Sequence, residues 1–329
     1  MNTPTGITIP TFEAKERAKA IAELQQLPPS VLPYCSDLIN QFNRKNDNEI
    51  DEQAARELIS ELTYCYFLLP ISIRQEHTIF RGRPVEAGTR LPNVAELGPP
   101  PAQVATTGRA NSHGESIFYG GSSDETVFSE LQLAAGHAVN IAAFSVKPMQ
   151  EITAYVIGEM DHLRRWGRPR FLPAGLEVHS QEILNSLHPD VALAIQLVDA
   201  FFADRFSRKG KEAYRVTNLI AREFLQSQTI DAIVFPSVAH PGGFNYAIKS
   251  QVSTERLQVR ACVAVEILKN YGYGSYLGGR YGLAKVSPAD TTVHWITPEH
   301  DPKMIQQFKE EMQKDPDSIT AWMMGSGSR

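Results

Sequence analysis

The sequence predicts an α+β protein in which a helical N-terminal region precedes a mixed core of strands and helices. Between residues 11 and 69, apolar side chains recur every three or four positions, which is typical of helices with one buried face. From His77 onward, short apolar runs are separated by turns rich in glycine and proline, which is typical of strands. The helical stretches do not alternate regularly with these strands, so a βαβ winding is not predicted. We therefore expect an all-helical accessory region at 1–74 and a second domain at 75–329.

The accessory region has one expected buried helical face and no cluster of residues suited to catalysis. Pro28, Pro29 and Pro70 interrupt it, because proline breaks a helix. Its simplest role is to cover a face of the second domain, and binding of a partner is the alternative. The residues expected to form the buried face are Ile50, Ala54, Leu58, Leu62, Cys65 and Leu69.

The second domain is expected to contain short strands and two longer helices, near 181–204 and 211–228. A long proline-rich loop lies between the first two strands, and loops of this length are commonly functional. The runs "HAVNIAAFSVKP" and "EITAYVIG" are expected to pair with each other, whereas "ACVAVEILKN" is either a strand or a helix. The other strands are expected at "HTIFRGRP", "ESIFYGG", "TIDAIVFPS" and "GGFNYAIKS".

Composition narrows the class of protein. A formal net charge of −5 argues against nucleic acid as the main partner. Cys35, Cys65 and Cys262 are widely spaced, so neither a disulfide framework nor a metal site is predicted. No uncharged segment approaches the roughly 20 residues of a membrane span, and the N-terminus lacks the apolar core of a signal peptide. We expect reduced thiols, no membrane contact and no cleaved signal peptide. The expected site of action is the cytoplasm, and export by a route that needs no cleaved signal is the alternative.

The segment "GRANSHGESIFYGGSSDETVFSEL" (108–131) gathers polar residues of the kinds that active sites use. Ser122 and Glu125 have the spacing of a capping box, which predicts the start of a helix. Glu130 falls on the flank of the apolar face of this helix, where functional carboxylates are often found; a solvated helix glutamate is the alternative. The apolar face is expected to comprise Val127, Phe128, Leu131, Ala134 and Ala135.

Three arginines and two strand ends supply further candidate residues. Arg81 and Arg83 end an apolar strand, and Arg109 lies in a turn. If they converge on one cleft they form a phosphate site, because the planar guanidinium matches phosphate oxygens; each alone is typical of a protein surface. Tyr119 ends a strand before two glycines, so its ring is either a stacking surface or part of the core. Ser237 ends a buried strand, where it either binds a ligand or caps the next turn.

Common nucleotide-binding and hydrolase motifs are absent. The sequence contains neither a GxGxxG that opens a helix nor a GxxxxGK[ST] loop. The run "FPSVAHPGG" also differs from the G-x-S-x-G motif of serine hydrolases. A serine hydrolase with Ser237 as nucleophile, and His240 or His113 as its base, stays open as an alternative.

Three strings, taken together, resemble the RES domain, a family named for an arginine, a glutamate and a serine. They are "FRGRP", "GRANSHGESIFYGGSSDETVFSEL" and "IDAIVFPSVAHPGGFNYAI", and the resemblance covers about residues 77–250. It assigns the arginine to Arg81, with Arg83 as second choice. The glutamate and the serine fall on Glu130 and Ser237, which are the expected catalytic residues.

The same strings supply the other expected substrate contacts. Arg109 matches the family's turn arginine and Tyr119 its strand-end tyrosine. We add Asn111 and Asn245, which lie in the second and third strings. No metal ligand is expected among these residues.

The resemblance implies a fold similar to ADP-ribosyltransferase toxins and an enzyme that destroys NAD⁺, often as the toxin of a toxin–antitoxin pair. NAD⁺ is then the substrate and no further cofactor is expected. The class of enzyme depends on the acceptor of the ADP-ribosyl group. Transfer to water makes the protein a glycohydrolase, transfer to phosphate makes it a phosphorylase, and transfer to a macromolecule makes it an ADP-ribosyltransferase. A catalytically silent binding module is the alternative from another class. The chain carries some 70 residues ahead of the domain that compact members lack, which leaves open whether an antitoxin, an immunity protein or a second copy of the chain binds it.

Overall fold

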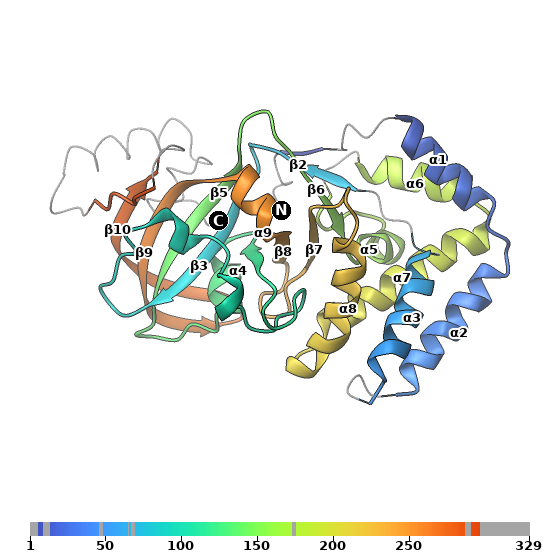
Figure 1. Ribbon diagram of the computed structural model, residues 1–329, viewed down its shortest axis with the longest axis horizontal. Coiled ribbons are helices and arrows are strands. Elements are labelled where there is room, and N and C mark those ends of the chain that lie inside the picture. The colour runs from blue at the N-terminus through green and yellow to red at the C-terminus, as the bar shows by residue number, and fades with distance from the viewer. Residues whose placement is uncertain are drawn as a thin grey trace.

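The protein consists of a curved sheet with a group of helices beside one end of it (Figure 1). The computed structural model describes residues 6–8, 14–45, 49–64, 66, 70–172, 176–286 and 291–296. Within these ranges, no helix combines the length and the apolar character needed to cross a membrane. The prediction of a mixed α and β fold is confirmed, and the finer likeness to ADP-ribosyltransferases stays a prediction.

One ten-stranded sheet contains all the named strands, in the order β1-β2-β6-β7-β8-β4-β3-β5-β9-β10. Neighbouring strands are antiparallel except β6 and β7, which are parallel. The strands are β1 Ile7–Thr8, β2 Ile71–Ile73, β3 Ile79–Val85, β4 Ile117–Gly121, β5 Ala138–Val146, β6 Ile152–Val156, β7 Ala232–Pro236, β8 Phe244–Lys249, β9 Leu257–Gly272 and β10 Ser275–Lys285.

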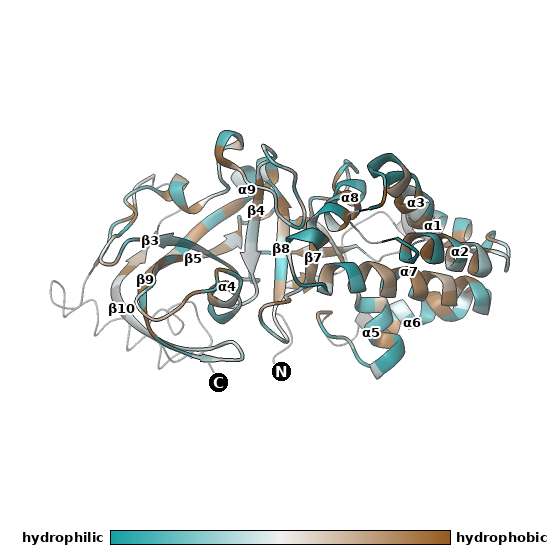
Figure 2. Ribbon diagram, turned by 90° about the horizontal axis from the view of Figure 1, so that it is seen from below, coloured by the Kyte–Doolittle hydropathy of each residue, from teal (hydrophilic) through white to brown (hydrophobic). Residues whose placement is uncertain are grey.

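Most of the helices lie in two segments of the chain. The first precedes the main strands, and the second forms the connection between β6 and β7, because parallel neighbours need a long crossover. The short helix α4 lies within the curve of β3, β5, β9 and β10 (Figure 2). The helices are α1 Ala14–Gln25, α2 Val31–Asn43, α3 Glu52–Tyr64, α4 Asp124–Glu130, α5 Glu159–Trp166, α6 Leu176–Ser186, α7 Pro189–Ser207, α8 Tyr214–Leu225 and α9 Ser250–Arg256.

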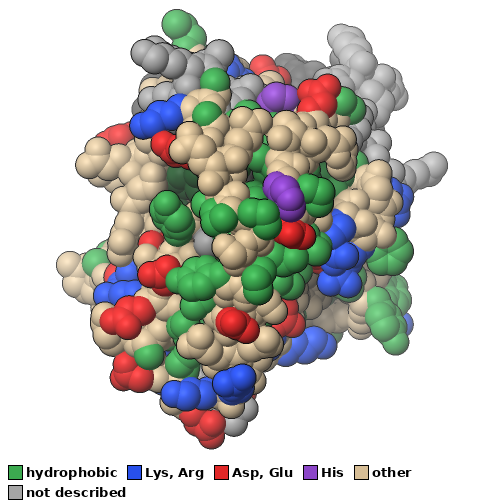
Figure 3. Space-filling view, turned by 90° about the vertical axis from the view of Figure 1, so that its right-hand side faces the viewer, with side chains coloured by type: hydrophobic (Ala, Val, Ile, Leu, Met, Phe, Trp, Pro, Cys, Tyr) green, Lys and Arg blue, Asp and Glu red, His purple; other side chains and the backbone are tan. Residues whose placement is uncertain are grey.

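The N-terminal helices share a hydrophobic core with the helices of the crossover. α2 packs on α7, and α3 packs on α8. This core contains residues from all four helices and from β7: Phe42 of α2, Leu62 of α3, Phe202 of α7, Ile220 of α8 and Phe235 of β7. Figure 2 shows hydrophobic residues along α7, in the middle of the group. Figure 3 shows this end of the molecule face on, with acidic and basic side chains intermixed rather than gathered by sign.

The structure corrects several predictions about the elements. The segment 1–74 contains β1 and β2 as well as helices, because its two ends add strands to an edge of the sheet. The buried face of α3 contains Ala55, Ile59 and Leu62 rather than Ala54 and Leu58, which are only partly buried. Cys65 and Leu69 lie outside the described residues. The expected helix at 181–204 is two helices, because Pro189 starts α7.

The strand predictions are right in position and wrong in one pairing. β5 and β6 were expected to pair, but β5 lies between β3 and β9 and β6 lies between β2 and β7. All nine residues of β5 are buried, so its sequence shows no alternation of polar and apolar residues. The local sequence therefore does not indicate which strands lie beside it. "ACVAVEILKN" lies in β9 and is therefore a strand.

Candidate active site

A cavity of about 210 Å³ opens between β3, β4, β8, α4 and α8. Five of the predicted site residues line it, although they lie far apart in the sequence. They are Arg81 from β3, Arg109 from the turn before β4, Tyr119 from β4, Glu130 from the end of α4 and Asn245 from β8.

The position of Glu130 depends on the local structure of α4. The helix is capped by Ser123, whose side chain accepts a hydrogen bond from the backbone N–H of Thr126. Ser122, the predicted cap, instead accepts a hydrogen bond from the N–H of Phe244 at the start of β8. α4 ends at Glu130, so the expected apolar face stops there, and Ala134 and Ala135 are exposed beyond it.

The Glu130 carboxylate is held by two side chains, one directly after β7 and one within the neighbouring strand β8. Its Oε1 accepts a hydrogen bond of 2.6 Å from the hydroxyl of Ser237 and another of 2.6 Å from Nδ2 of Asn245. Both donors are buried, whereas Glu130 itself is exposed. Within the described part of the chain, no hydrogen bond reaches Oε2. The carboxylate is therefore fixed through one oxygen, and the other is available to a ligand.

The Ser237 hydroxyl is oriented by its own loop. It accepts a hydrogen bond of 2.9 Å from the backbone N–H of His240, and its own backbone N–H donates to the carbonyl of Gly243. Its proton is thereby directed to Glu130. Across the described residues no imidazole bonds this hydroxyl, and His113 is exposed, so the geometry of a serine hydrolase is not formed.

Arg81 combines a structural role with a place in the cavity wall. Its Nε donates to the carbonyls of Leu97 and Gly98, and its Nη1 donates to the carbonyl of Tyr119 at 2.6 Å. Burial, followed by the charge of Arg83, lowers the pKa of Arg81 to about 10, which leaves it charged at neutral pH. Arg83 lies two residues farther along β3 and does not line the cavity.

Arg109 presents an unsatisfied donor. Its Nη2 donates to the carbonyl of Arg208 at 2.7 Å, and its guanidinium carbon lies 5.3 Å from the centroid of the Tyr214 ring. Its Nη1 is buried and has no hydrogen-bond partner among the described residues. A buried donor without a partner is costly, so this atom fits the place of an anionic ligand group.

Tyr119 and Asn111 build the turn rather than projecting freely. The Tyr119 hydroxyl accepts from the N–H of Ala110 at 2.7 Å and donates to Oδ1 of Asn111 at 2.8 Å, while burial raises its pKa. Nδ2 of Asn111 donates to three loop carbonyls, and Asn111 does not line the cavity. A Cβ on Gly108 would lie 2.6 Å from Oδ1 of Asn111 and 2.7 Å from the Tyr119 hydroxyl oxygen, which is why glycine is needed there. The ring of Tyr119 is thus a fixed wall.

Sequence reasoning missed the aromatic residues that complete the cavity. Phe80, Phe235 and Tyr214 line it from β3, β7 and the first turn of α8. Phe80 directly precedes Arg81 in β3, and Phe235 lies in β7 two residues before Ser237. Both could therefore have been proposed from the strands that carry the predicted site residues. Tyr214 had none, because it reaches the cavity only through the packing of α8.

One family model matches the chain. The family model of the RES domain matches residues 90–261, just over half of the chain. This chain belongs to the RES family. At family level the RES domain is a NAD-related, toxin-like domain. The match includes Arg109 through Asn245 and begins after Arg81, which the structure nevertheless places in the cavity wall. No curated protein and no solved structure matches the chain.

Proposed function

We propose that this RES protein cleaves the bond between nicotinamide and ribose in NAD⁺. The observation that carries the proposal is the Glu130 carboxylate, held through one oxygen by Ser237 and Asn245 at the wall of a cavity that two arginines also line. A single preorganised carboxylate with cations for phosphate is the set of groups that this reaction requires.

The chemistry explains why one carboxylate suffices. When the C1″–N bond breaks, its electron pair moves to the pyridinium nitrogen, so nicotinamide leaves as a neutral molecule and needs no general acid. An oxygen of water or of phosphate forms the new bond to C1″, and water then gives up one proton to the solvent. Hydrolysis of ordinary sugar acetals generally needs two carboxylates because their leaving oxygen must be protonated. Here Glu130 accepts a hydrogen bond from a ribose hydroxyl and stabilises positive charge that develops on the ribose in the transition state.

The remaining residues are proposed to bind and orient the substrate. Arg109 Nη1, buried without a partner, contacts the pyrophosphate together with Arg81. The fixed ring of Tyr119 lies against the nicotinamide. Ser237 acts through its hydrogen bond to Glu130. The cavity volume of about 210 Å³ is below the roughly 300–1,000 Å³ of pockets that enclose whole ligands, so it accommodates the nicotinamide ribose and the adjoining phosphates rather than the whole dinucleotide.

The decisive experiment follows NAD⁺ over time with the purified protein, in buffers with and without inorganic phosphate. Chromatography of the products is expected to show nicotinamide together with ADP-ribose, or with ADP-ribose-1″-phosphate when phosphate is the acceptor. These products distinguish a glycohydrolase from a phosphorylase. An unchanged NAD⁺ pool, with no nicotinamide released, would overturn the proposal.

A further inference from the structure

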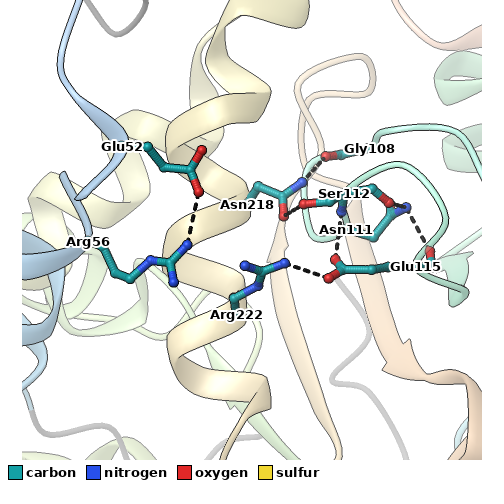
Figure 4. A network of polar contacts seen from close by, with 8 residues as sticks. All are labelled: Glu52, Arg56, Gly108, Asn111, Ser112, Glu115, Asn218 and Arg222. Atoms are coloured by element: carbon teal, nitrogen blue, oxygen red, sulfur yellow. Dashed lines mark hydrogen bonds and ion pairs between the residues drawn. The ribbon is translucent and has the colours of Figure 1, made fainter. Parts of the chain in front are cut away.

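One stripe of α8 faces the turn that carries Arg109. Tyr214, Asn218 and Arg222 are spaced four residues apart, so they lie on the same face of the helix. Figure 4 shows Asn218 and Arg222 pointing from α8 toward the loop that contains Gly108, Ser112 and Glu115. Tyr214, one turn before Asn218, lies under the guanidinium of Arg109.

Each residue of this stripe contacts a different part of the loop. Nδ2 of Asn218 donates to the carbonyl of Gly108 at 3.1 Å, and its Oδ1 accepts from the hydroxyl of Ser112 at 3.2 Å. Arg222 forms an ion pair of 2.5 Å with Glu115. Glu115 in turn accepts a hydrogen bond from the backbone N–H of Ser112. The loop is therefore attached to α8 at its start, its middle and its end.

Asn218 is the central contact because it is buried and spans the turn. It is only 6 % exposed, and it bonds residues on both sides of Arg109. Gly108 immediately precedes Arg109, so the bond to its carbonyl fixes the peptide from which the arginine projects. Loss of that bond would release the residue whose Nη1 is buried without a partner.

α8 is itself held from its other side by the N-terminal helices. Ser60 of α3 donates a hydrogen bond to Glu223 of α8, and α3 packs along α8. In Figure 4 the pair Glu52–Arg56 of α3 lies across α8 from the loop. The helix is thus a fixed support for the turn.

We propose that Asn218 is a positioning residue that holds Arg109 in the geometry needed to bind the pyrophosphate of the substrate. The proposal rests on the proposed function for the role of Arg109, but Asn218 itself does not touch the substrate. Its effect is then exerted entirely through Arg109, which separates it from a residue that only stabilises the fold.

The test is a double-mutant cycle of Asn218→Asp and Arg109→Ala. Asn218→Asp keeps the size of the side chain and the acceptor for Ser112, but it cannot donate to the carbonyl of Gly108. The affinity for ADP-ribose is measured by titration calorimetry, and the KM and kcat for NAD⁺ are measured separately. Glu223→Gln, on the face of α8 turned to α3, is the control, because glutamine keeps the acceptor oxygen for Ser60 and leaves the support of α8 in place.

We expect Asn218→Asp to raise the Kd for ADP-ribose and the KM for NAD⁺ about tenfold, as for a weakened hydrogen bond to a charged group, with kcat changed less than about twofold. Added to Arg109→Ala, it is expected to have no further effect. Wild-type affinity of Asn218→Asp, or effects that multiply in the double variant, would overturn the positioning role.

The same measurements separate this inference from the proposed function. If the wild type releases no nicotinamide but the variants show the expected pattern in ADP-ribose binding, the proposed function is wrong and the positioning role stands. If NAD⁺ is cleaved and Asn218→Asp behaves as the wild type, the proposed function stands and the positioning role of Asn218 is wrong. A wild-type protein that neither binds ADP-ribose nor cleaves NAD⁺ overturns both.

Discussion

Glu130 receives both of its hydrogen bonds on the same oxygen, an arrangement that suits the role proposed for it. Ser237 and Asn245 fix the plane of the carboxylate through Oε1, while Oε2 stays available to a ligand. Glu130 ends α4 and is exposed, so the precision of its placement comes from these two buried donors rather than from its own burial.

We expect Glu130→Gln to lower kcat for NAD⁺ by at least about 100-fold, because one preorganised charge contact lowers a barrier by roughly 3–4 kcal/mol. The thermal midpoint is expected to stay close to that of the wild type, since the substitution preserves the shape of the side chain. Nicotinamide release measures kcat. Glu125→Gln, on the same helix but outside the cavity wall, serves as the control, and near-normal turnover by Glu130→Gln would contradict the role of this residue.

The short strings of the sequence name three residues that the structure brings together, Glu130, Ser237 and Asn245, and their catalytic role stays a prediction. Ser237 and Asn245 follow or occupy recognisable strands, and Glu130 follows a recognisable helix start. The role of Asn111 could not be predicted, because its side chain donates hydrogen bonds to carbonyls of its own loop. These carbonyls come close to it only when the loop is folded. Tyr214 and Asn218 were missed because only the packing of α8 brings them to the turn.

At the scale of elements, the seven residues of α4 connect the capping residue Ser123 to Glu130, the proposed catalytic residue. A helix this short has little stability of its own, so its cap and its packing determine whether it forms. Thr126, Val127 and Phe128 supply the buried side, and Ser123 supplies the cap.

Removal of this cap is expected to affect both stability and activity. Ser123→Ala should lower the free energy of unfolding by about 1 kcal/mol, and it should lower kcat because Glu130 lies at the other end of the same helix. Ser123→Asp, which retains an acceptor for the N–H of Thr126, is expected to restore both. Urea unfolding and nicotinamide release measure the two effects. Equal losses in the Ala and Asp variants would show that the cap is not the cause.

Elements were easier to predict than their partners. Turn residues and apolar runs locate β3, β4, β7 and β8 well, because these signals are local. The capping residue was misplaced by one position because Ser122 and Ser123 are chemically alike, and only the bond of Ser122 to β8 separates their roles. The neighbours of β5 and β6 depend on long-range pairing, which no local pattern contains.

At the scale of the whole molecule, the N-terminal helices and the crossover helices form one core. Leu62 of α3 is fully buried there, beside side chains from α7, α8 and β7. The division of the chain at residue 74 stays a prediction from sequence, and the shared core gives it a direct test.

We expect Leu62→Ala to lower the free energy of unfolding by about 2–5 kcal/mol. In urea unfolding, the midpoint for loss of activity and the midpoint for loss of the helical circular dichroism signal are expected to fall by the same urea concentration. A cavity in a shared core weakens every element that lines it. Tyr64→Ala, at a residue 78 % exposed on the same helix, is the control and should change little. Separate transitions, with activity surviving the first, would instead show that residues 1–74 fold as an independent unit.

The distance along the chain between Glu130 and its donors has a consequence for synthesis. Ser237 and Asn245 follow Glu130 by 107 and 115 residues, so a ribosome must complete β7 and β8 before the carboxylate acquires either partner. A nascent chain that has exposed only the glutamate has no assembled site. If the protein consumes NAD⁺ as proposed, the order of translation itself therefore delays the onset of activity until β8 has been synthesised.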